Sequence, residues 1–467
     1  MQSWLSSILK RPERIFLVVG SFFGLISLFL MPALTIPDEG AHFWMSYGMF
    51  SKNQQIPHDL LISAENSAEY IKDGTYIEKI FKHKANLEGD SLRFKISREI
   101  SLNSLNENRP VSSLDISRLP QAIGIAIGRV IYPSIGVMTT LGRLLNFAVF
   151  LTALYLIIKR VNYGKLAFTF LALFPMIIHQ AASLSYDVMN IVVIFAWVAF
   201  MINLFTQQTP ITRNQIIKLS LLGIVLIATK PSNALLLGLL PFLPLNLYRN
   251  TRIFTQIHKR IPRFRISKRL LKLLLWPLAI AGLGGIIFLG DAYLAKYGIS
   301  SMKFMQVFFN TFFRTELNTQ LDPIVTTGIV GHFGWLWYKL PEWLVIIHLS
   351  IFGLILLGEK VPRVSLRLAI VSASLFALSV LLITLGMYLM WTLRPNIAGS
   401  DATFIQGMQG RYFTPLLVLL IPVFAYIQQY ISVKIKPRLL SILAVAMAVF
   451  SLTVYLFLTY IFFYLAD

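Results

Sequence analysis

The chain alternates long apolar segments with shorter polar ones. A membrane-spanning helix needs about 20 mainly apolar residues. Eleven segments reach or approach that length: 14–34, 138–158, 166–184, 187–206, 215–229, 232–248, 273–290, 342–358, 366–391, 412–430 and 438–463. This alternation predicts an all-α integral membrane protein with about 11 transmembrane helices.

Segment 119–134 is apolar as well, but it has about 16 residues and contains Arg129. A span at this place would put the polar motifs before and after it on opposite sides of the membrane. We therefore expect an interfacial helix that lies in, or dips into, the outer membrane surface.

The composition agrees with a membrane protein. Apolar residues make up 56% of the 467 residues and charged residues only 13%, whereas soluble domains contain about 25% charged residues. The chain contains no cysteine, which excludes disulfide bonds, thiol catalysis and zinc sites with cysteine ligands.

The net charge of +21 follows the predicted topology. If the N-terminus is cytoplasmic, the inner segments contain 23 Lys and Arg residues and two acidic residues, Glu13 and Glu359. This distribution is the one that the positive-inside rule describes, so we do not expect nucleic acid as a partner. Nine of the basic residues lie in loop 249–272, which we expect to contact anionic lipids.

The predicted topology divides the chain into blocks of spans separated by outer loops. The divisions are 1–13 (cytoplasmic N-terminus), 14–34 (first span), 35–137 (large first outer loop), 138–291 (spans two to seven, with loop 249–272), 292–340 (outer loop) and 341–467 (last four spans, with outer loop 392–410). The sequence has no phosphate-binding glycine loop, dinucleotide fingerprint or His-Glu-x-x-His pattern. Nucleotide-driven transport is therefore not expected.

Asp38, Glu39 and His42 directly follow the first span. Charges beside the hydrocarbon are costly and usually have a partner or a function. A carboxylate at this surface can accept the proton of a hydroxyl group on a membrane-anchored substrate. The alternative is that Asp38 and Glu39 complement the dipole of a helix that begins near Thr35. We favour function because three ionisable groups converge.

Other polar residues gather at span ends on the same outer side: Asp187, Lys230, His332, Gln409, Arg411 and Tyr412. Asp187 and Lys230 also have a simpler interpretation, since an acid suits the start of a helix and a cation suits its end. For these two residues the sequence leaves both interpretations open.

Arg411 contradicts both of these charge preferences. It opens a span that runs from the outer to the inner side, where the helix dipole and the positive-inside bias both disfavour a cation. An anionic partner explains it better. That partner is either a substrate phosphate or carboxylate, or Asp401 or Asp187 in a structural ion pair.

The chain resembles a bacterial family of polytopic membrane proteins of unknown function that is grouped with the GT-C glycosyltransferases. The motifs that carry the resemblance are 36–42 (IPDEGAH), 180–187 (QAASLSYD), 230–231 (KP), 331–335 (GHFGW), 409–412 (QGRY) and the stretch 119–146. GT-C enzymes transfer a sugar from a polyprenyl-phosphate donor and use a catalytic carboxylate in the first outer loop. The resemblance therefore implies a GT-C-like fold and this activity.

By this resemblance, Asp38 is the catalytic base and Glu39 the alternative. Arg411, with Lys230, is expected to hold the departing polyprenyl phosphate during an inverting transfer. The other expected substrate-binding residues are His42, Asp187, His332, Gln409 and Tyr412. Asp38, Glu39 and Asp187 are also candidate ligands for Mg²⁺ or Mn²⁺, because both ions prefer carboxylate oxygens, although the spacing does not demand a metal.

The implied partners are a polyprenyl-phosphate sugar donor and a cell-envelope glycan acceptor, at the outer face of the bacterial cytoplasmic membrane. A polysaccharide polymerase or ligase is the alternative enzyme. A lipid-linked glycan transporter is the alternative from another class, and it should show polar or broken spans near the middle of the membrane. Ionisable residues at span ends favour surface chemistry instead, with Arg143 as the main exception.

Overall fold

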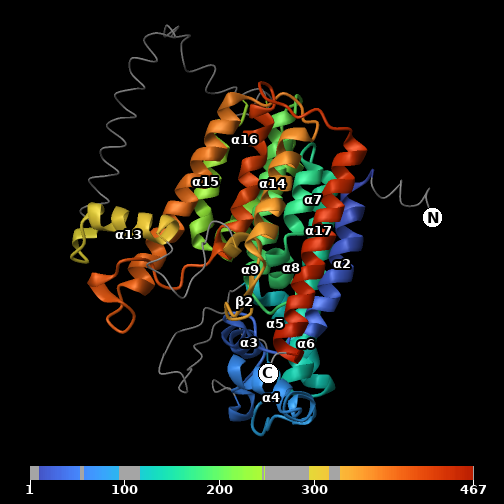
Figure 1. Ribbon diagram of the computed structural model, residues 1–467, viewed down its shortest axis with the longest axis vertical. Helices are drawn as coiled ribbons and strands as arrows, with labels where there is room; N and C mark the ends of the chain where they lie inside the picture. The colour runs from blue at the N-terminus through green and yellow to red at the C-terminus, as the bar shows by residue number, and fades with distance from the viewer. Residues whose placement is uncertain are drawn as a thin grey trace.

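The computed structural model describes residues 10–52, 57–93, 116–244, 247, 294–314 and 327–465. Helices dominate this part of the chain (Figure 1). Within it, five helices are long and apolar enough to cross a membrane: α2 (Pro12–Leu30), α6 (Ile135–Arg160), α9 (Asp187–Thr206), α15 continued by η9 (Leu366–Thr392), and α17 continued by η13 (Pro437–Leu465). The described chain is mostly helical with five candidate membrane spans, which agrees with the predicted all-α membrane protein. The number of spans and the GT-C-like fold stay predictions.

Several other predicted spans form shorter helices. These are α10 (Arg213–Thr229), α14 (Glu342–Gly358), the 3₁₀-helix η5 (Pro231–Phe242), and η12 (Thr414–Leu419) followed by α16 (Leu420–Ile427). The predicted span 273–290 and the basic loop 249–272 lie outside the described residues.

The apolar segment 166–184 does not form one continuous helix. It is divided into α7 (Lys165–Ala172) and α8 (Pro175–Ala181). Pro175 lacks a backbone N–H and disfavours helical geometry in the residue before it, so the helix ends and restarts there. In η5, Pro241 likewise lies inside a segment that is 3₁₀-helical rather than α-helical.

The long helices lie side by side along the long axis of the molecule (Figure 1). Helix α2 packs against α6 and α17, and α9 packs against α6 and α10. A large apolar core fills the space between them, with Phe150, Phe195 and Trp197 fully buried.

The first outer loop forms a cluster of short helices at one end of this bundle (Figure 1). The described elements are α3 (Glu39–Gly48), η1 (His58–Leu60), α4 (Ala64–Lys72), η2 (Ile77–Lys82), η4 (Ile116–Arg118) and α5 (Leu119–Ile131). Helix α5 rises only about 20 Å, which is shorter than the roughly 30 Å hydrocarbon core. A non-spanning helix at 119–134 agrees with this length.

Helix α5 is held close to the first half of α6. A Cβ atom added at Gly124 would lie 2.3 Å from the carbonyl oxygen of Leu141, and one at Gly128 would lie 2.8 Å from the Cα of Met138. Only glycine permits so close an approach of the two backbones. This packing fixes Arg143, one turn further along α6, next to the loop that follows α2.

Three other segments are α13 (Ser301–Phe313), η10 (Gly399–Asp401) and η11 (Gly410–Tyr412). Helix α13 lies at the side of the bundle (Figure 1) and contacts the backbone of Thr403 and Ile405 after η10. A hairpin of β1 (His332–Phe333) and antiparallel β2 (Tyr338–Lys339) covers the start of the outer cluster. Phe333 packs against Tyr455 of α17 with 4.3 Å between ring centroids. The Trp335 indole N–H donates to the carbonyl of Leu34 at 3.5 Å.

Several helices end or begin at the opposite end of the bundle, and basic residues are frequent there. There the Asn203 side-chain amide donates to the Arg160 carbonyl at 2.9 Å, and the Leu166 N–H donates to Glu359 at 2.9 Å. The ends of α6, α7, α9 and α14 thus meet on one side of the bundle, as the predicted topology requires. Which side faces the cytoplasm stays a prediction.

Candidate functional site

Asp38 and Arg411 form an ion pair at the outer-cluster end of the bundle. The Nη2 of Arg411 donates to the Oδ2 of Asp38 at 2.9 Å. The Arg411 side chain is 4% exposed, whereas the Asp38 side chain is 53% exposed. The cation is therefore held inside the protein, and the carboxylate remains accessible to a solute.

The backbone presents Asp38 without using its side chain for helix capping. Asp38 precedes α3 with φ 63° and ψ 6°, and its carboxylate makes no capping hydrogen bond. The Thr35 hydroxyl donates to the Pro32 carbonyl instead of capping the helix. Asp tolerates the left-handed region better than most residues, so the chain of turns after α2 can turn once more here and point the carboxylate at Arg411.

Arg411 is positioned by a close contact between two glycines. It lies in η11, where a Cβ atom at Gly410 would be 2.2 Å from the backbone of Gly328. A side chain at Gly410 would push η11 away from the segment before the hairpin. Close backbone packing thus explains the glycine at position 410, and the ion pair with Asp38 explains the arginine at position 411.

Glu39, the neighbour of Asp38, faces the opposite way. It is fully buried, and its two oxygens accept from Nε and Nη2 of Arg143 at 2.8 and 2.6 Å. Oε1 also accepts the backbone N–H of Leu184 at 3.0 Å. Arg143 directs its remaining N–H groups to three carbonyls at the end of α2: those of Leu28, Met31 and Pro32.

This arrangement gives the two adjacent carboxylates different surroundings. All five N–H donors of a guanidinium have acceptors around Arg143, and both Glu39 oxygens are engaged. Glu39 therefore ties α2, α3 and α6 together. Its oxygens accept three hydrogen bonds and its side chain is fully buried, so it is not accessible to a substrate. Of the two carboxylates that the sequence places here, Asp38 is the one in position to act as a base.

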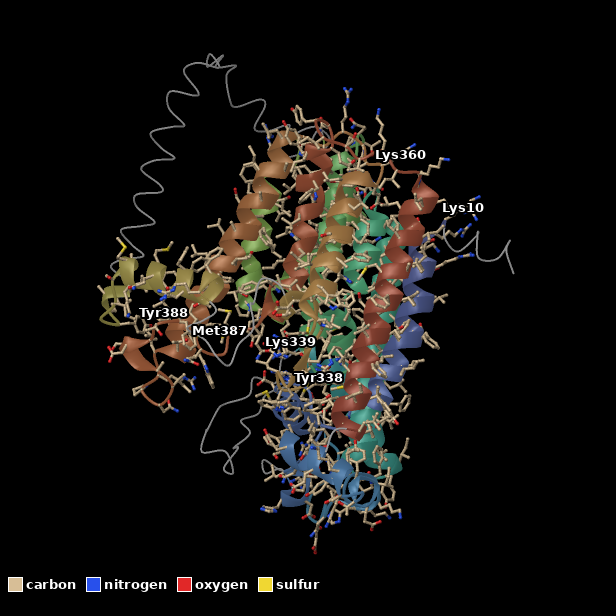
Figure 2. The ribbon with its side chains drawn as sticks, viewed as in Figure 1. Lys10, Tyr338, Lys339, Lys360, Met387 and Tyr388 are labelled. Carbon is tan, nitrogen blue, oxygen red and sulfur yellow. The ribbon has the colours of Figure 1, made fainter. Side chains whose placement is uncertain are left out.

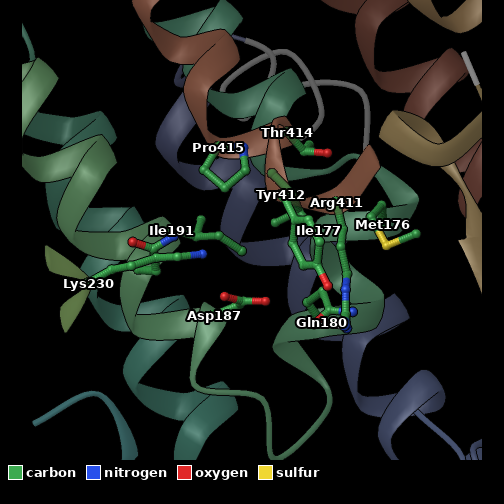
Figure 3. A pocket seen from close by; sticks show the side chains of 11 residues that line it. Met176, Ile177, Gln180, Asp187, Ile191, Lys230, Arg411, Tyr412, Thr414 and Pro415 are labelled. Carbon is green, nitrogen blue, oxygen red and sulfur yellow. Dashed lines mark hydrogen bonds between the residues drawn. The ribbon is translucent and has the colours of Figure 1, made fainter. Parts of the chain in front are cut away.

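A cleft beside Arg411 brings four of the sequence-predicted residues together (Figure 3). Its lining consists of Asp187, Lys230, Arg411 and Tyr412, with Met176, Ile177, Gln180, Asn190, Ile191, Thr414 and Pro415. The cleft is narrow, with a cavity volume of about 10 Å³, which is room for about one water molecule. The Lys230 ammonium lies 5.6 Å from the Tyr412 ring centroid. Two cations and one carboxylate thus face one small space.

One N–H group of Arg411, at Nε, donates no hydrogen bond to the described residues around it. Its Nη1 is 3.5 Å from the Oε1 of Gln180. Among the described residues, no hydrogen-bond partner lies near the buried Nε of Arg411 or the buried Nε2 of Gln180. Burial alone would lower the pKa of Arg411, but Tyr412, Asp187 and Asp38 outweigh it and raise the pKa above its ordinary value. The guanidinium therefore stays cationic.

His42 lies behind the Asp38 loop in α3. Its ring meets the Tyr186 ring edge-on, with 5.0 Å between centroids. Burial, followed by the nearby charges of Arg118 and Arg411, holds the pKa of His42 well below its usual value. The imidazole is therefore neutral at pH 7. The Arg118 guanidinium in turn lies 4.9 Å from the Tyr186 ring centroid.

His332 and Gln409 do not line the cleft. His332 lies in the hairpin, where its Nε2 is 3.0 Å from the Leu336 carbonyl oxygen. Gln409 precedes η11, and its Oε1 is buried without a hydrogen-bond partner among the described residues. The structural ion pair suggested for Arg411 with Asp401 or Asp187 is also not the one observed, because the carboxylate in contact with Arg411 is that of Asp38.

The three carboxylates considered for Mg²⁺ or Mn²⁺ are not brought together. Within the described ranges, no three His, Cys, Asp or Glu side chains are grouped closely enough to hold a metal ion. The reason is visible for Glu39, whose oxygens point to Arg143 and away from Asp38 and Asp187.

Two participants were not predicted from the sequence. Gln180 contacts Arg411, and Arg143 is the buried partner of Glu39. A signal existed for Arg143, since a lone arginine within an apolar span needs a buried partner. Gln180 gave only the weaker signal of a polar residue at a span end.

Residues 21–420 match the family model described as "Predicted membrane protein (DUF2142)". No curated protein and no solved structure matches the chain. The matched range includes Asp38, Arg143, Asp187, Lys230 and Arg411. The family is one of membrane proteins of unknown function. Because the match covers most of the chain, the protein belongs to the DUF2142 family of predicted membrane proteins.

Proposed function

We propose that this protein is a membrane glycosyltransferase of the GT-C type, acting on a polyprenyl-phosphate sugar at the outer face of the cytoplasmic membrane. The observation that carries the proposal is the Asp38–Arg411 pair beside a cleft that also contains Lys230. An accessible carboxylate paired with one cation, with a second cation in the adjoining cleft, suits a reaction that removes a proton from one substrate and releases a phosphate from the other.

Asp38 is the proposed general base. Its half-exposed carboxylate accepts the proton of the acceptor hydroxyl as that oxygen attacks the anomeric carbon of the donor. The bond from the anomeric carbon to the phosphate oxygen breaks on the opposite face, so the configuration inverts. The electron pair of the broken bond stays on the polyprenyl phosphate.

Arg411 and Lys230 are the proposed phosphate ligands. Negative charge develops on the leaving phosphate, and donors already aimed at it stabilise the transition state. The Nε of Arg411, which lacks a partner among the described residues, supplies such a donor. The contact with Asp38 keeps the guanidinium in place before the donor arrives.

Asp187, Tyr412 and neutral His42 are proposed to orient the two substrates. Asp187 and Tyr412 line the cleft, where carboxylate and phenol oxygens can hydrogen-bond sugar hydroxyls. His42 can donate or accept without adding charge. A polysaccharide polymerase or ligase uses the same groups on a longer acceptor and remains the alternative enzyme.

A lipid-linked glycan transporter is the second candidate, because one of its expected features is present. The segment 166–184 is broken between α7 and α8, and transporters use broken spans at their binding sites. Against this alternative, Leu173 and Phe174 at the break are buried and apolar. A substrate-binding break should carry polar groups.

The test is transfer by the purified protein in proteoliposomes. The vesicles receive polyprenyl-phosphate sugars and an acceptor extract from host cell envelopes, and the released polyprenyl phosphate is quantified by mass spectrometry. Release that depends on both the acceptor and Asp38 supports the enzyme. Movement of intact donor across the bilayer, without any release of polyprenyl phosphate, would support the transporter and end the proposal.

A further inference from the structure

A second cavity lies at the basic end of the bundle, away from the Asp38–Arg411 site. Three cations from separate elements line it: Lys10 before α2, Lys360 after α14 and Arg438 at the start of α17. Figure 2 shows Lys10 and Lys360 at this end, remote from Tyr338 and Lys339 of the hairpin. The empty volume, including the opening, is about 1340 Å³.

The rest of the lining is mainly apolar: Pro12, Leu166, Gly358, Pro437 and Leu440, with Ser441 and Glu359. Among the described residues, Glu359 is the one acid of this lining. Its two oxygens accept the N–H groups of Leu166 and Ala167 at 2.9 and 3.0 Å, so they face the start of α7. Three cations thus surround a partly apolar space, and the single carboxylate there is already hydrogen-bonded.

We propose that this cavity binds the head group of an anionic phospholipid. The cations match a phosphate, and the apolar lining matches the glycerol and the first methylenes of the acyl chains. The location agrees, since α2 and α17, both long enough to span a membrane, begin at this cavity. A bilayer around them brings its head groups to this level.

The bound lipid connects parts of the chain that are far apart in sequence. Lys10 lies near the start of the described chain, whereas Lys360 and Arg438 lie in its last third at the ends of separate helices. The mutual repulsion of these three cations opposes packing of α2, α14 and α17. An anion that binds all three removes this repulsion. It therefore stabilises the folded protein, as any ligand that prefers the folded state does.

The test uses the purified full chain in a non-ionic detergent. Short-chain phosphatidylglycerol is titrated by calorimetry, and phosphatidylcholine of equal chain length and inorganic phosphate serve as separate titrants. We expect saturable binding of phosphatidylglycerol that weakens as salt screens the charges. The other two titrants should bind at least tenfold more weakly. Equal binding of inorganic phosphate would identify a site for free anions, and equal binding of phosphatidylcholine would show that charge is not recognised; either result overturns the proposal.

Two neutralising variants and one charge-conserving variant locate the site. Lys360→Gln and Arg438→Gln should each weaken phosphatidylglycerol binding about fivefold, as expected for one cation at an anionic surface. Arg438→Lys should retain most of the affinity. Both side chains are exposed, so the melting temperature without lipid should not fall.

The matched control is Arg367→Gln. Arg367 is an exposed cation at the start of α15, at the same end of the bundle, and it does not line the cavity. Its variant should bind like the wild type. An equal loss of affinity in this control, or no loss in either cavity variant, would mean that general surface charge attracts the lipid and would overturn the proposal.

Discussion

Glu39 and Arg143 form a buried ion pair with N–O distances of 2.8 and 2.6 Å, although 104 residues separate them in the chain. The pair anchors the loop that carries Asp38. Because Arg143 also binds the last carbonyls of α2, the position of Asp38 depends on a residue of α6 that never touches it. The predictions below separate the chemistry of Asp38 from this anchoring.

Asp38→Asn should lower sugar transfer by about two to four orders of magnitude, because an amide cannot accept the hydroxyl proton. The variant also removes the ion-pair partner of the buried Arg411 side chain. Because Asp38 itself is 53% exposed, the loss of stability should be smaller than that of Glu39→Gln, and transfer is measured at a temperature at which the variant is folded. Release of polyprenyl phosphate and the melting temperature are measured on the same preparation. Near-wild-type turnover would remove Asp38 from the mechanism.

Glu39→Gln should lower the stability of the folded protein, and it should not reduce sugar transfer by the protein that remains folded. It leaves the Arg143 guanidinium buried without its counter-charge, which costs about 3–5 kcal/mol. Thermal unfolding in detergent measures this loss, with Asp38→Asn as the neighbouring control. A normal melting temperature together with abolished transfer would instead give Glu39 the catalytic role.

Arg411→Ala should weaken the binding of a polyprenyl-phosphate analogue by about 10- to 100-fold, since a hydrogen bond to a charged group contributes about 1.5–3 kcal/mol. Arg411→Lys should restore only part of the affinity, because lysine lacks the bidentate fork. Analogue affinity is measured on folded protein. Unchanged affinity in Arg411→Ala would leave the arginine with only the structural pairing to Asp38.

Protonation of Glu359, at the basic end of the bundle, should make the melting temperature of the protein depend on pH. Burial raises the pKa of Glu359 to about 7, against the opposing hydrogen bonds from Leu166 and Ala167. The folded protein therefore binds this proton more tightly than the unfolded chain. The contribution of Glu359 to stability is fully present below about pH 4.5 and is lost as the pH rises through about 7. Melting temperatures at pH 5 and 7.5 should differ less in Glu359→Gln than in the wild type. An identical pH response of the two proteins would contradict this assignment.

Single cysteines placed in this cysteine-free chain test the topology. Lys84→Cys in the first outer loop and Ala398→Cys near η10 should react with an impermeant maleimide added to intact cells. Gln256→Cys should react only after the membrane is permeabilised; it lies in the basic segment outside the described residues. Labelling of Gln256→Cys from outside would reverse the proposed orientation.

The sequence alone determined the class of the protein. Runs of apolar residues are a local property, and a bilayer requires about 20 of them for each helix. The positions of 14–34 and 138–158 therefore agree with α2 and α6 to within a few residues at each end. The sequence also predicted that four cleft residues lie on the same side of the membrane, because each follows or begins a predicted span: Asp187, Lys230, Arg411 and Tyr412.

Only the tertiary structure decided which of two adjacent carboxylates is accessible. Asp38 and Glu39 are equivalent in composition and spacing, but the left-handed turn at Asp38 sends their side chains to opposite partners, Arg411 and Arg143. Those partners lie 373 and 104 residues away. Local patterns such as apolar length and charge bias contain no information about such contacts, because they arise from how α6 and η11 pack against the end of α2.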